Sequence, residues 1–296
     1  MDGRDRGTGP DLEVDLPGGG RTGLALLGDP AGHPVLCCHG GLTCRLDVAP
    51  AHGAARRAGV LLVSPDRPGV ARSVREPGRT VGGWATRAAA LADHLGLGRF
   101  AVLGWSMGGP YALGCAALLA DRVEAVAVVA GGVPLAWPCA SGTFLDRLDA
   151  RLMALARERP GTAELVVAAS RRLALDPPAW LEVARRTMPP VDVAAIEEVG
   201  VARYAAAVAE GLACPAGVVD EFLAFDAPWG FAHGDVAQPV RLWQGSEDPV
   251  VPPSWSEATA AALPRAELRT VAGAGHLVAV GRWDEILGDL LAAAAG

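Results

Sequence analysis

The sequence predicts an α/β fold: a mostly parallel eight-stranded sheet flanked by helices, with an inserted helical cap. Three observations support this class. Eight short apolar or alternating runs are bounded by turn residues, the later runs alternate with helical patterns, and one connection of about 105 residues is helical in character. Strands that are almost wholly apolar and alternate with helices indicate a parallel sheet covered on both faces.

The expected elements follow one another along the chain. The predicted strands cover residues 12–16, 22–27, 34–38, 60–64, 100–103, 123–130, 240–243 and 267–271. Helical periodicity predicts helices over residues 80–95, 107–119, 254–263 and 283–294. The strand and helix that follow each other from residue 100 to 119 carry the most informative motif of the chain.

The long connection is expected to form the cap. We assign residues 133–239 to this cap and residues 1–132 and 240–296 to the core. Proline and glycine punctuation divides the cap into helices around residues 143–158, 163–175, 179–187, 192–210 and 216–225. The segment holds nine arginines against fourteen acidic residues, a formal charge of −5 out of the total of −7. An acidic cap disfavours polyanionic substrates.

The composition excludes several mechanisms. All 26 basic residues are arginine, and the chain has neither lysine nor asparagine. Without lysine there is no Schiff-base catalysis, no Ser-Lys dyad and no lysine-containing phosphate loop. Without asparagine there is no Cys-His-Asn triad, so the simplest oxyanion donors are backbone amides. The net charge of −7 and the absence of long arginine runs argue against nucleic acid as a partner.

Cysteine usage and the N-terminal residues predict the compartment. The six cysteines lack CxxC spacing, and four lie among apolar residues, so free thiols in a reducing environment are expected. The charged, glycine-rich start shows no signal peptide. The uncharged stretch 100–120 is long enough for a membrane span, but glycines and a Gly-Pro step divide it into a strand and a helix. We expect a cytoplasmic protein with no membrane, metal or cofactor requirement.

Three residues form a candidate catalytic set. Ser106 lies in Gly-Trp-Ser-Met-Gly, a GxSxG sequence between a predicted strand and helix, a context that leaves a serine hydroxyl exposed. A serine hydroxyl requires a neighbouring base held by a carboxylate. His276 and Asp248 each follow a predicted strand, and ligands bind at the carboxyl ends of strands in open parallel sheets. The neighbouring Glu247 is the alternative candidate for the carboxylate that holds the histidine.

At this point the chain resembles the α/β-hydrolase family. Five motifs occur in the family's order: Cys-His-Gly-Gly at residues 38–41, Asp-Arg-Pro-Gly at residues 66–69, the serine at Ser106, the acid at Asp248 and the base at His276. The resemblance covers nearly everything from residue 12 onward apart from the cap. Together the five motifs are far more specific than the GxSxG sequence alone.

The resemblance implies roles for further residues. Gly41 would supply one oxyanion-hole amide, and Met107, the residue after the nucleophile, would supply the other. His39 is expected to orient the oxyanion loop. The chain departs from many members at Ala71, where they carry a second glycine, so the conformation of that loop stays open.

Substrate contacts are expected near the motifs and at the two ends of the cap. The candidates are Leu42, Trp137, Trp229 and Leu277. Trp137 and Trp229, together with Phe231, are equally consistent with packing where the cap meets the core.

The resulting hypothesis is a cofactor-independent serine hydrolase that acts on a small-molecule ester or lactone through an acyl-enzyme on Ser106. The same triad serves carbon–carbon and amide hydrolysis, cofactor-free peroxidation, and acyl transfer or cyclisation, so these alternatives stay open. Epoxide hydrolases and haloalkane dehalogenases are disfavoured because they carry aspartate in place of Ser106. A non-catalytic small-molecule receptor on the same fold is the alternative from a different class. The sequence leaves the substrate and the oligomeric state open.

Overall fold

A single eight-stranded sheet forms the centre of the molecule. The computed structural model describes residues 9–18, 20–140 and 148–296. The strand order is β1-β2-β4-β3-β5-β6-β7-β8; β2 pairs antiparallel with β1 and β4, and the other neighbouring pairs are parallel. The strands are β1 (Gly9–Leu16), β2 (Gly20–Gly28), β3 (His33–Cys38), β4 (Val60–Pro65), β5 (Phe100–Trp105), β6 (Val123–Val129), β7 (Val240–Gly245) and β8 (Ala266–Val271). The predicted fold class is therefore confirmed.

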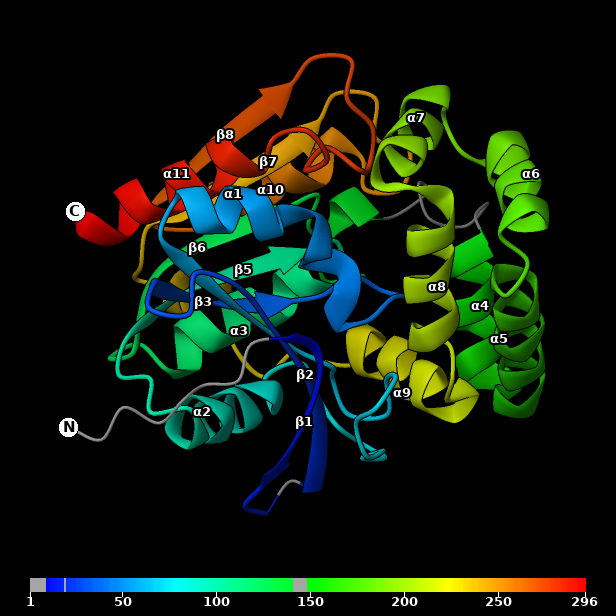
Figure 1. Ribbon diagram of the computed structural model, residues 1–296, viewed down its shortest axis with the longest axis horizontal. Helices are drawn as coiled ribbons and strands as arrows, with labels where there is room; N and C mark the ends of the chain where they lie inside the picture. Colours follow the sequence, from blue (N-terminus) through cyan, green and yellow to red (C-terminus); the bar gives the residue numbers. More distant parts are fainter. Residues whose placement is uncertain (1–8, 19, 141–147) are drawn as a thin grey trace.

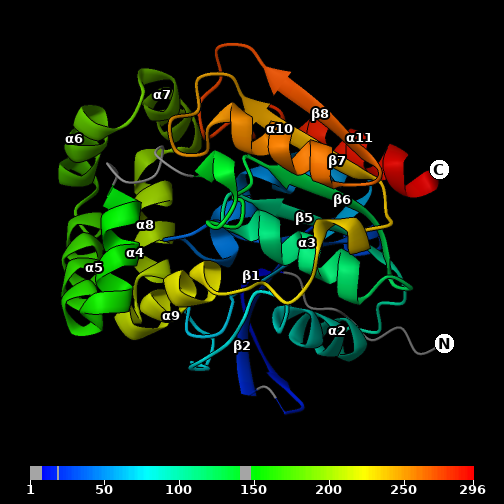
Figure 2. The ribbon, with the colours of Figure 1, turned by 180° about the vertical axis from the view of Figure 1, so that it is seen from behind.

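Helices cover both faces of the sheet (Figures 1 and 2). Helices α1 (His52–Arg57) and α11 (Trp283–Ala295) cover one face, and α2 (Trp84–His94), α3 (Gly108–Leu118) and α10 (Pro253–Ala262) cover the other. Side chains of β5 alternate between the two apolar layers: Phe100 and Val102 join one, Ala101 and Leu103 the other. This double burial explains why the central strands are continuously apolar.

In the described part of the connection between β6 and β7, six α-helices group together beside one end of the sheet (Figure 1). They are α4 (Leu148–Glu158), α5 (Pro160–Ala174), α6 (Pro177–Thr187), α7 (Pro190–Val199), α8 (Val201–Gly211) and α9 (Pro215–Asp226). Proline occupies the first turn of four of them, where its missing N–H costs nothing. The prediction of one helix over 192–210 was wrong: Gly200, with φ of +97°, separates α7 from α8. Residues 143–147 of the first predicted cap helix lie outside the described residues.

Two other segments differ from expectation. The helix predicted over 80–95 begins at Trp84, because Gly82 and Gly83 precede it and the Gly82 amide donates to Trp229 O at 2.9 Å. The segment after β3 forms a 3₁₀ helix, η1 (Arg45–Ala51), followed directly by α1. Pro50 lies inside η1 and interrupts any helical pattern that the sequence could have displayed there.

The uncharged stretch 100–120 forms β5 and α3, joined by a tight turn at Ser106. Among the described helices, none has both the length and the apolar character needed to span a bilayer.

Candidate active site

Ser106 stands at a sharp turn between β5 and α3. Its φ of +53° lies in the left-handed region that residues other than glycine rarely adopt. The Ser106 amide donates to Val129 O at 2.8 Å, which fixes the turn on the neighbouring strand. A Cβ atom on Gly104 would lie 2.4 Å from Gly108 O, and one on Gly108 would lie 2.0 Å from Cys38 O. Both glycines of the GxSxG sequence are therefore needed for the close approach of the backbone.

The three residues of the predicted catalytic set form one hydrogen-bonded chain. His276 Nε2 lies 3.0 Å from Ser106 Oγ, and His276 Nδ1 lies 2.9 Å from Asp248 Oδ2. An ionised carboxylate only accepts hydrogen bonds, so we assign the proton of the neutral imidazole to Nδ1. Nε2 is then an acceptor directed at the serine hydroxyl, the arrangement required of a general base.

Asp248 is held rigidly in the loop after β7. Its Oδ1 accepts hydrogen bonds from the amides of Val250 at 2.7 Å and Val251 at 2.9 Å. Its Oδ2 accepts from Gln244 Nε2 at 3.2 Å, in addition to His276. The residue is buried, whereas Glu247 is exposed. The structure therefore brings Asp248, and not its neighbour, to the histidine.

The environment of His276 favours its charged form. Burial alone would lower the pKa of His276, but the charge and hydrogen bond of Asp248, with smaller contributions from Asp192 and Asp47, raise it above 6.5. A base with a raised pKa holds the proton taken from the serine more strongly.

The predicted oxyanion loop after β3 is held by two buried side chains. Arg67 donates through its backbone N–H to His39 Nε2 at 3.2 Å and through Nη2 to Gly40 O at 2.9 Å. His39 Nδ1 donates to Gly40 O at 2.8 Å, which assigns the proton to Nδ1. Burial and the Arg67 charge lower the pKa of His39 to about 3, so the ring is neutral. His39 and Arg67 therefore support the loop, and neither is placed to move a proton.

Gly41 and Met107 lie against each other at the predicted oxyanion hole. A Cβ atom on Gly41 would lie 3.2 Å from Met107 Cε. Among the described residues, neither backbone N–H has a hydrogen-bond acceptor, so both amides are available to an oxyanion. Leu42, the next residue, has φ of +57°, and Ala71 has φ of +45°. Ala71 thus adopts the left-handed conformation that glycine adopts more easily.

Asp47 in η1 is a carboxyl group near the triad that the sequence analysis missed. Its Oδ2 accepts a hydrogen bond from the Gly40 amide at 2.8 Å. Burial raises the pKa of Asp47 to about 6, although the Gly40 hydrogen bond and the charges of Arg67 and His276 oppose this rise. No motif marks this position, because the hydrogen bond depends on the path of η1 in three dimensions.

Asp192 is a second carboxyl group that the sequence analysis missed. It lies in the first turn of the cap helix α7 and is 1% exposed. Its Oδ1 accepts from the Leu277 amide at 2.8 Å and its Oδ2 from the His276 amide at 3.2 Å. The partners are 84 and 85 positions away along the chain. A hydrogen bond across this separation leaves no local pattern in the sequence.

A second cap acid, Glu221 of α9, is paired inside the molecule. Its carboxylate accepts a hydrogen bond from Arg67 Nε and lies 3.7 Å from Arg79 Nη1. Burial would raise the pKa of Glu221, but the charges of Arg67 and Arg79 lower it below its usual value. The cap thus binds the same arginine that holds the oxyanion loop.

The four predicted substrate contacts are distributed over two regions. Trp137 and Trp229 pack on the ring of His233, with centroids 4.5 and 5.9 Å away, and the Trp229 indole N–H donates to Phe225 O. These contacts lie within the connection itself; the core is contacted by Trp137, which packs in a cluster with Val251 and Trp255, and by Trp229, whose O accepts a hydrogen bond from the Gly82 amide. Leu42 and Leu277 directly adjoin Gly41 and His276, so they are the two candidates next to the triad.

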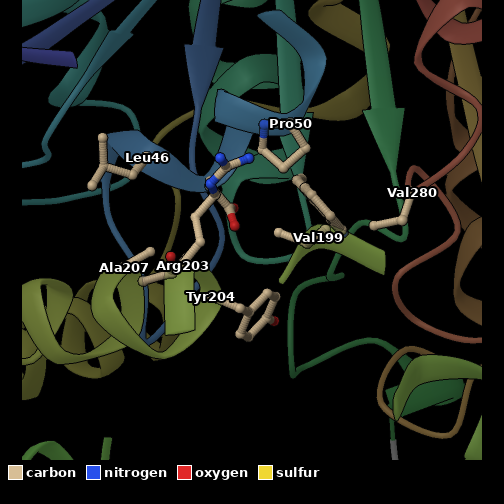
Figure 3. Close-up of a pocket in the computed structure, with 10 residues that line it drawn as sticks. Leu46, Pro50, Val199, Arg203, Tyr204, Ala207 and Val280 are labelled. Carbon is tan, nitrogen blue, oxygen red and sulfur yellow. The ribbon is translucent and has the colours of Figure 1, made fainter. Parts of the chain in front are cut away.

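A small cavity of about 20 Å³ lies between η1 and α8 (Figure 3). Its walls are mainly apolar, and in Figure 3 Arg203 extends from α8 towards Pro50, whereas the Tyr204 ring lies on the side away from Leu46 and Pro50. Asp47 and Trp105, the residue before Ser106, also line it. The cavity has room for about one or two water molecules.

Within the part of the chain that the structure describes, no group of three or more His, Cys, Asp or Glu side chains is arranged to hold a metal ion.

Comparison with known proteins identifies the family. A model of the alpha/beta hydrolase family matches residues 35–288. The chain belongs to the α/β-hydrolase family. The match identifies the chain as a hydrolase. No curated protein matches the chain in sequence.

Solved structures share the fold at low sequence identity. An enol-lactonase from Burkholderia xenovorans LB400 is 17% identical with a TM-score of 0.71, and the match covers 96% of this chain and 100% of that one. A thermophilic esterase from Thermogutta terrifontis is 22% identical with a TM-score of 0.65, covering 96% and 97%. An esterase from Exiguobacterium antarcticum is 15% identical with a TM-score of 0.68, covering 97% and 100%. At these sequence identities the similarity shows a shared fold and nothing beyond it.

Proposed function

We propose that the protein is a cofactor-independent serine hydrolase that cleaves the ester or lactone bond of a small molecule. The observation that carries the proposal is the chain from Ser106 Oγ through His276 to Asp248, with distances of 3.0 and 2.9 Å. A serine hydroxyl becomes a nucleophile when a base accepts its proton and a carboxylate holds that base. Esterases and an enol-lactonase among the fold neighbours are consistent with this reaction class.

The reaction has two halves. Ser106 Oγ attacks the acyl carbon while His276 Nε2 takes its proton, and Asp248 stabilises the imidazolium that forms. The amides of Gly41 and Met107 donate to the oxyanion of the tetrahedral intermediate. His276 then gives the proton to the departing alkoxide oxygen, leaving an acyl group on Ser106. A water molecule, deprotonated by His276, releases the acid and restores the serine.

The test compares two serine variants. Ser106→Ala should lose hydrolysis of p-nitrophenyl acetate by about 10³-fold or more and should no longer react with a fluorophosphonate probe. Ser170→Ala is the matched control, because its hydroxyl donates only to Val166 O within helix α5. We expect this control to retain both activity and labelling. Unchanged turnover in Ser106→Ala would refute the proposal.

The labelling experiment also separates the alternatives. A protein that reacts with the probe but hydrolyses no ester or lactone in a panel would favour acyl transfer or cyclisation, since these use the same nucleophile. A protein that does not react would favour a non-catalytic receptor.

A further inference from the structure

We propose that Asp192 of the cap is a positioning residue for the catalytic base, so that the His276 loop takes its working conformation only while α7 is docked on the core. This inference rests on the proposed role of His276. It goes beyond that role by assigning to a cap side chain a function in the chemistry of the core.

The hydrogen-bond geometry is the first argument. One carboxylate binds two successive backbone amides, those of His276 and Leu277, at 3.2 and 2.8 Å. Two bonds from one group fix the direction of the backbone from which the imidazole projects. The residue before the histidine leaves space for this contact only because it is glycine. A Cβ atom on Gly275 would lie 2.5 Å from both Asp192 oxygens.

The packing of α7 is the second argument, because it fixes the carboxylate. Asp192 N donates to Pro189 O at 3.0 Å, in the turn that begins the helix. Ile196, one helical turn later, is fully buried in the apolar layer that also contains Trp105 and Leu277. Burying a carboxylate without hydrogen-bond partners is unfavourable in free energy, so α7 packs in the position where Asp192 binds the two amides.

Charge is the third argument. Three acidic groups act on His276: Asp248 from the loop after β7, Asp192 from α7 and Asp47 from η1. Two further groups lie around these acids, since Tyr204 of α8 interacts with Asp47 and Asp192, and Arg67 interacts with Asp47. Asp192 adds to the negative potential that stabilises the imidazolium during each proton transfer. A cap residue therefore affects both the position and the proton affinity of the base.

The principal test is Asp192→Asn. The asparagine side chain has a single acceptor oxygen, so one amide loses its partner and the negative charge is removed. We expect kcat to fall about tenfold with little change in KM, from the loss of one charge-assisted hydrogen bond. The acid limb of kcat/KM, and the titration of the His276 ring followed by NMR, should both move to lower pH by about 0.5 to 1 unit.

The matched control is Glu197→Gln, which removes one negative charge from the same helix. Glu197 is half-exposed and pairs with Arg185, away from the histidine. We expect its pH profile to equal that of the unmodified protein. A titration of His276 that is the same in Asp192→Asn and in Glu197→Gln would overturn the inference.

A second pair of variants serves if Asp192→Asn does not fold. Gly275→Ala places a methyl group against the Asp192 carboxylate and should lower kcat. In an Asp192→Ala background the same change should lower kcat much less, because the carboxylate is gone. An equal fall in kcat in the two backgrounds would contradict the inference.

The NMR titration reports on His276 without catalysis. An active Ser106→Ala variant would therefore refute the proposed function and still leave the effect of Asp192 measurable.

Discussion

The buried ion pair between Arg67 and Glu221 gives a quantitative prediction. The Arg67 side chain is 0% exposed and that of Glu221 is 2% exposed, so neither charge has water to replace a lost partner. Glu221→Gln removes the negative charge that balances the Arg67 guanidinium. Removing one partner of a buried pair costs about 3 to 5 kcal/mol. For a chain of this size, about 2 to 3 °C per kcal/mol predicts a fall in Tm of about 6 to 15 °C.

The assay is thermal and urea unfolding of Glu221→Gln beside Glu197→Gln, whose pair with Arg185 lies on the surface. We expect the surface variant to keep the stability of the unmodified protein. The pH dependence has a definite sign. Because the pKa of Glu221 is lowered in the folded state, its contribution is present above the unfolded pKa and is lost as the pH falls through the folded pKa. Equal stability of the two variants would refute the assignment of a strong buried pair.

Three further predictions follow from the site. Because the pKa of His276 is raised, mainly by Asp248 against the effect of burial, kcat/KM should rise with pH through a midpoint above 6.5; a midpoint below 6 would contradict this. Ala71→Gly should raise the free energy of unfolding by about 0.5 kcal/mol, since it relieves a φ of +45°, whereas Ala206→Gly in helix α8 should lower it by about 1 kcal/mol; urea unfolding measures both. We propose that the acyl group enters the small cavity beside Trp105, so kcat/KM should be higher for p-nitrophenyl acetate than for the decanoate, and Leu46→Ala, which enlarges the cavity, should narrow the difference; an unmodified protein that prefers the decanoate would refute this role of the cavity.

The sheet and the triad could be predicted because both leave local signals. The central strands are buried on two faces, so most of their residues are apolar, and all eight predicted strands agree with the structure within three residues. Ser106 follows the central strand β5, Asp248 follows β7, and His276 follows the edge strand β8. Parallel strands bring their carboxyl ends to one edge of the sheet, and the three residues meet there at hydrogen-bonding distances.

The residues that support the triad could not be predicted because their contacts join distant parts of the chain. Asp192 and Glu221 occur among fourteen acidic residues of the cap, and nothing in the local sequence separates a buried acid from a solvated one. The break at Gly200 was missed for a related reason. A single glycine is tolerated within a helical pattern, and its φ of +97° depends on how α7 and α8 pack.

The acidic cap has a structural role besides any effect on substrate charge. Three of its acids point into the core: Asp192 binds the histidine loop, Glu221 binds Arg67, and Glu210 binds the buried Arg45, which also holds Asp66. Displacing the whole cap would leave Arg67 without the charge of Glu221 and two backbone amides without an acceptor, while Arg45 would keep Asp11 and Asp66. Each loss costs about 1 to 5 kcal/mol. We therefore propose that this helical segment is a fixed part of the candidate active site, because its acids contact both the His276 loop and the arginine that holds the loop after β3.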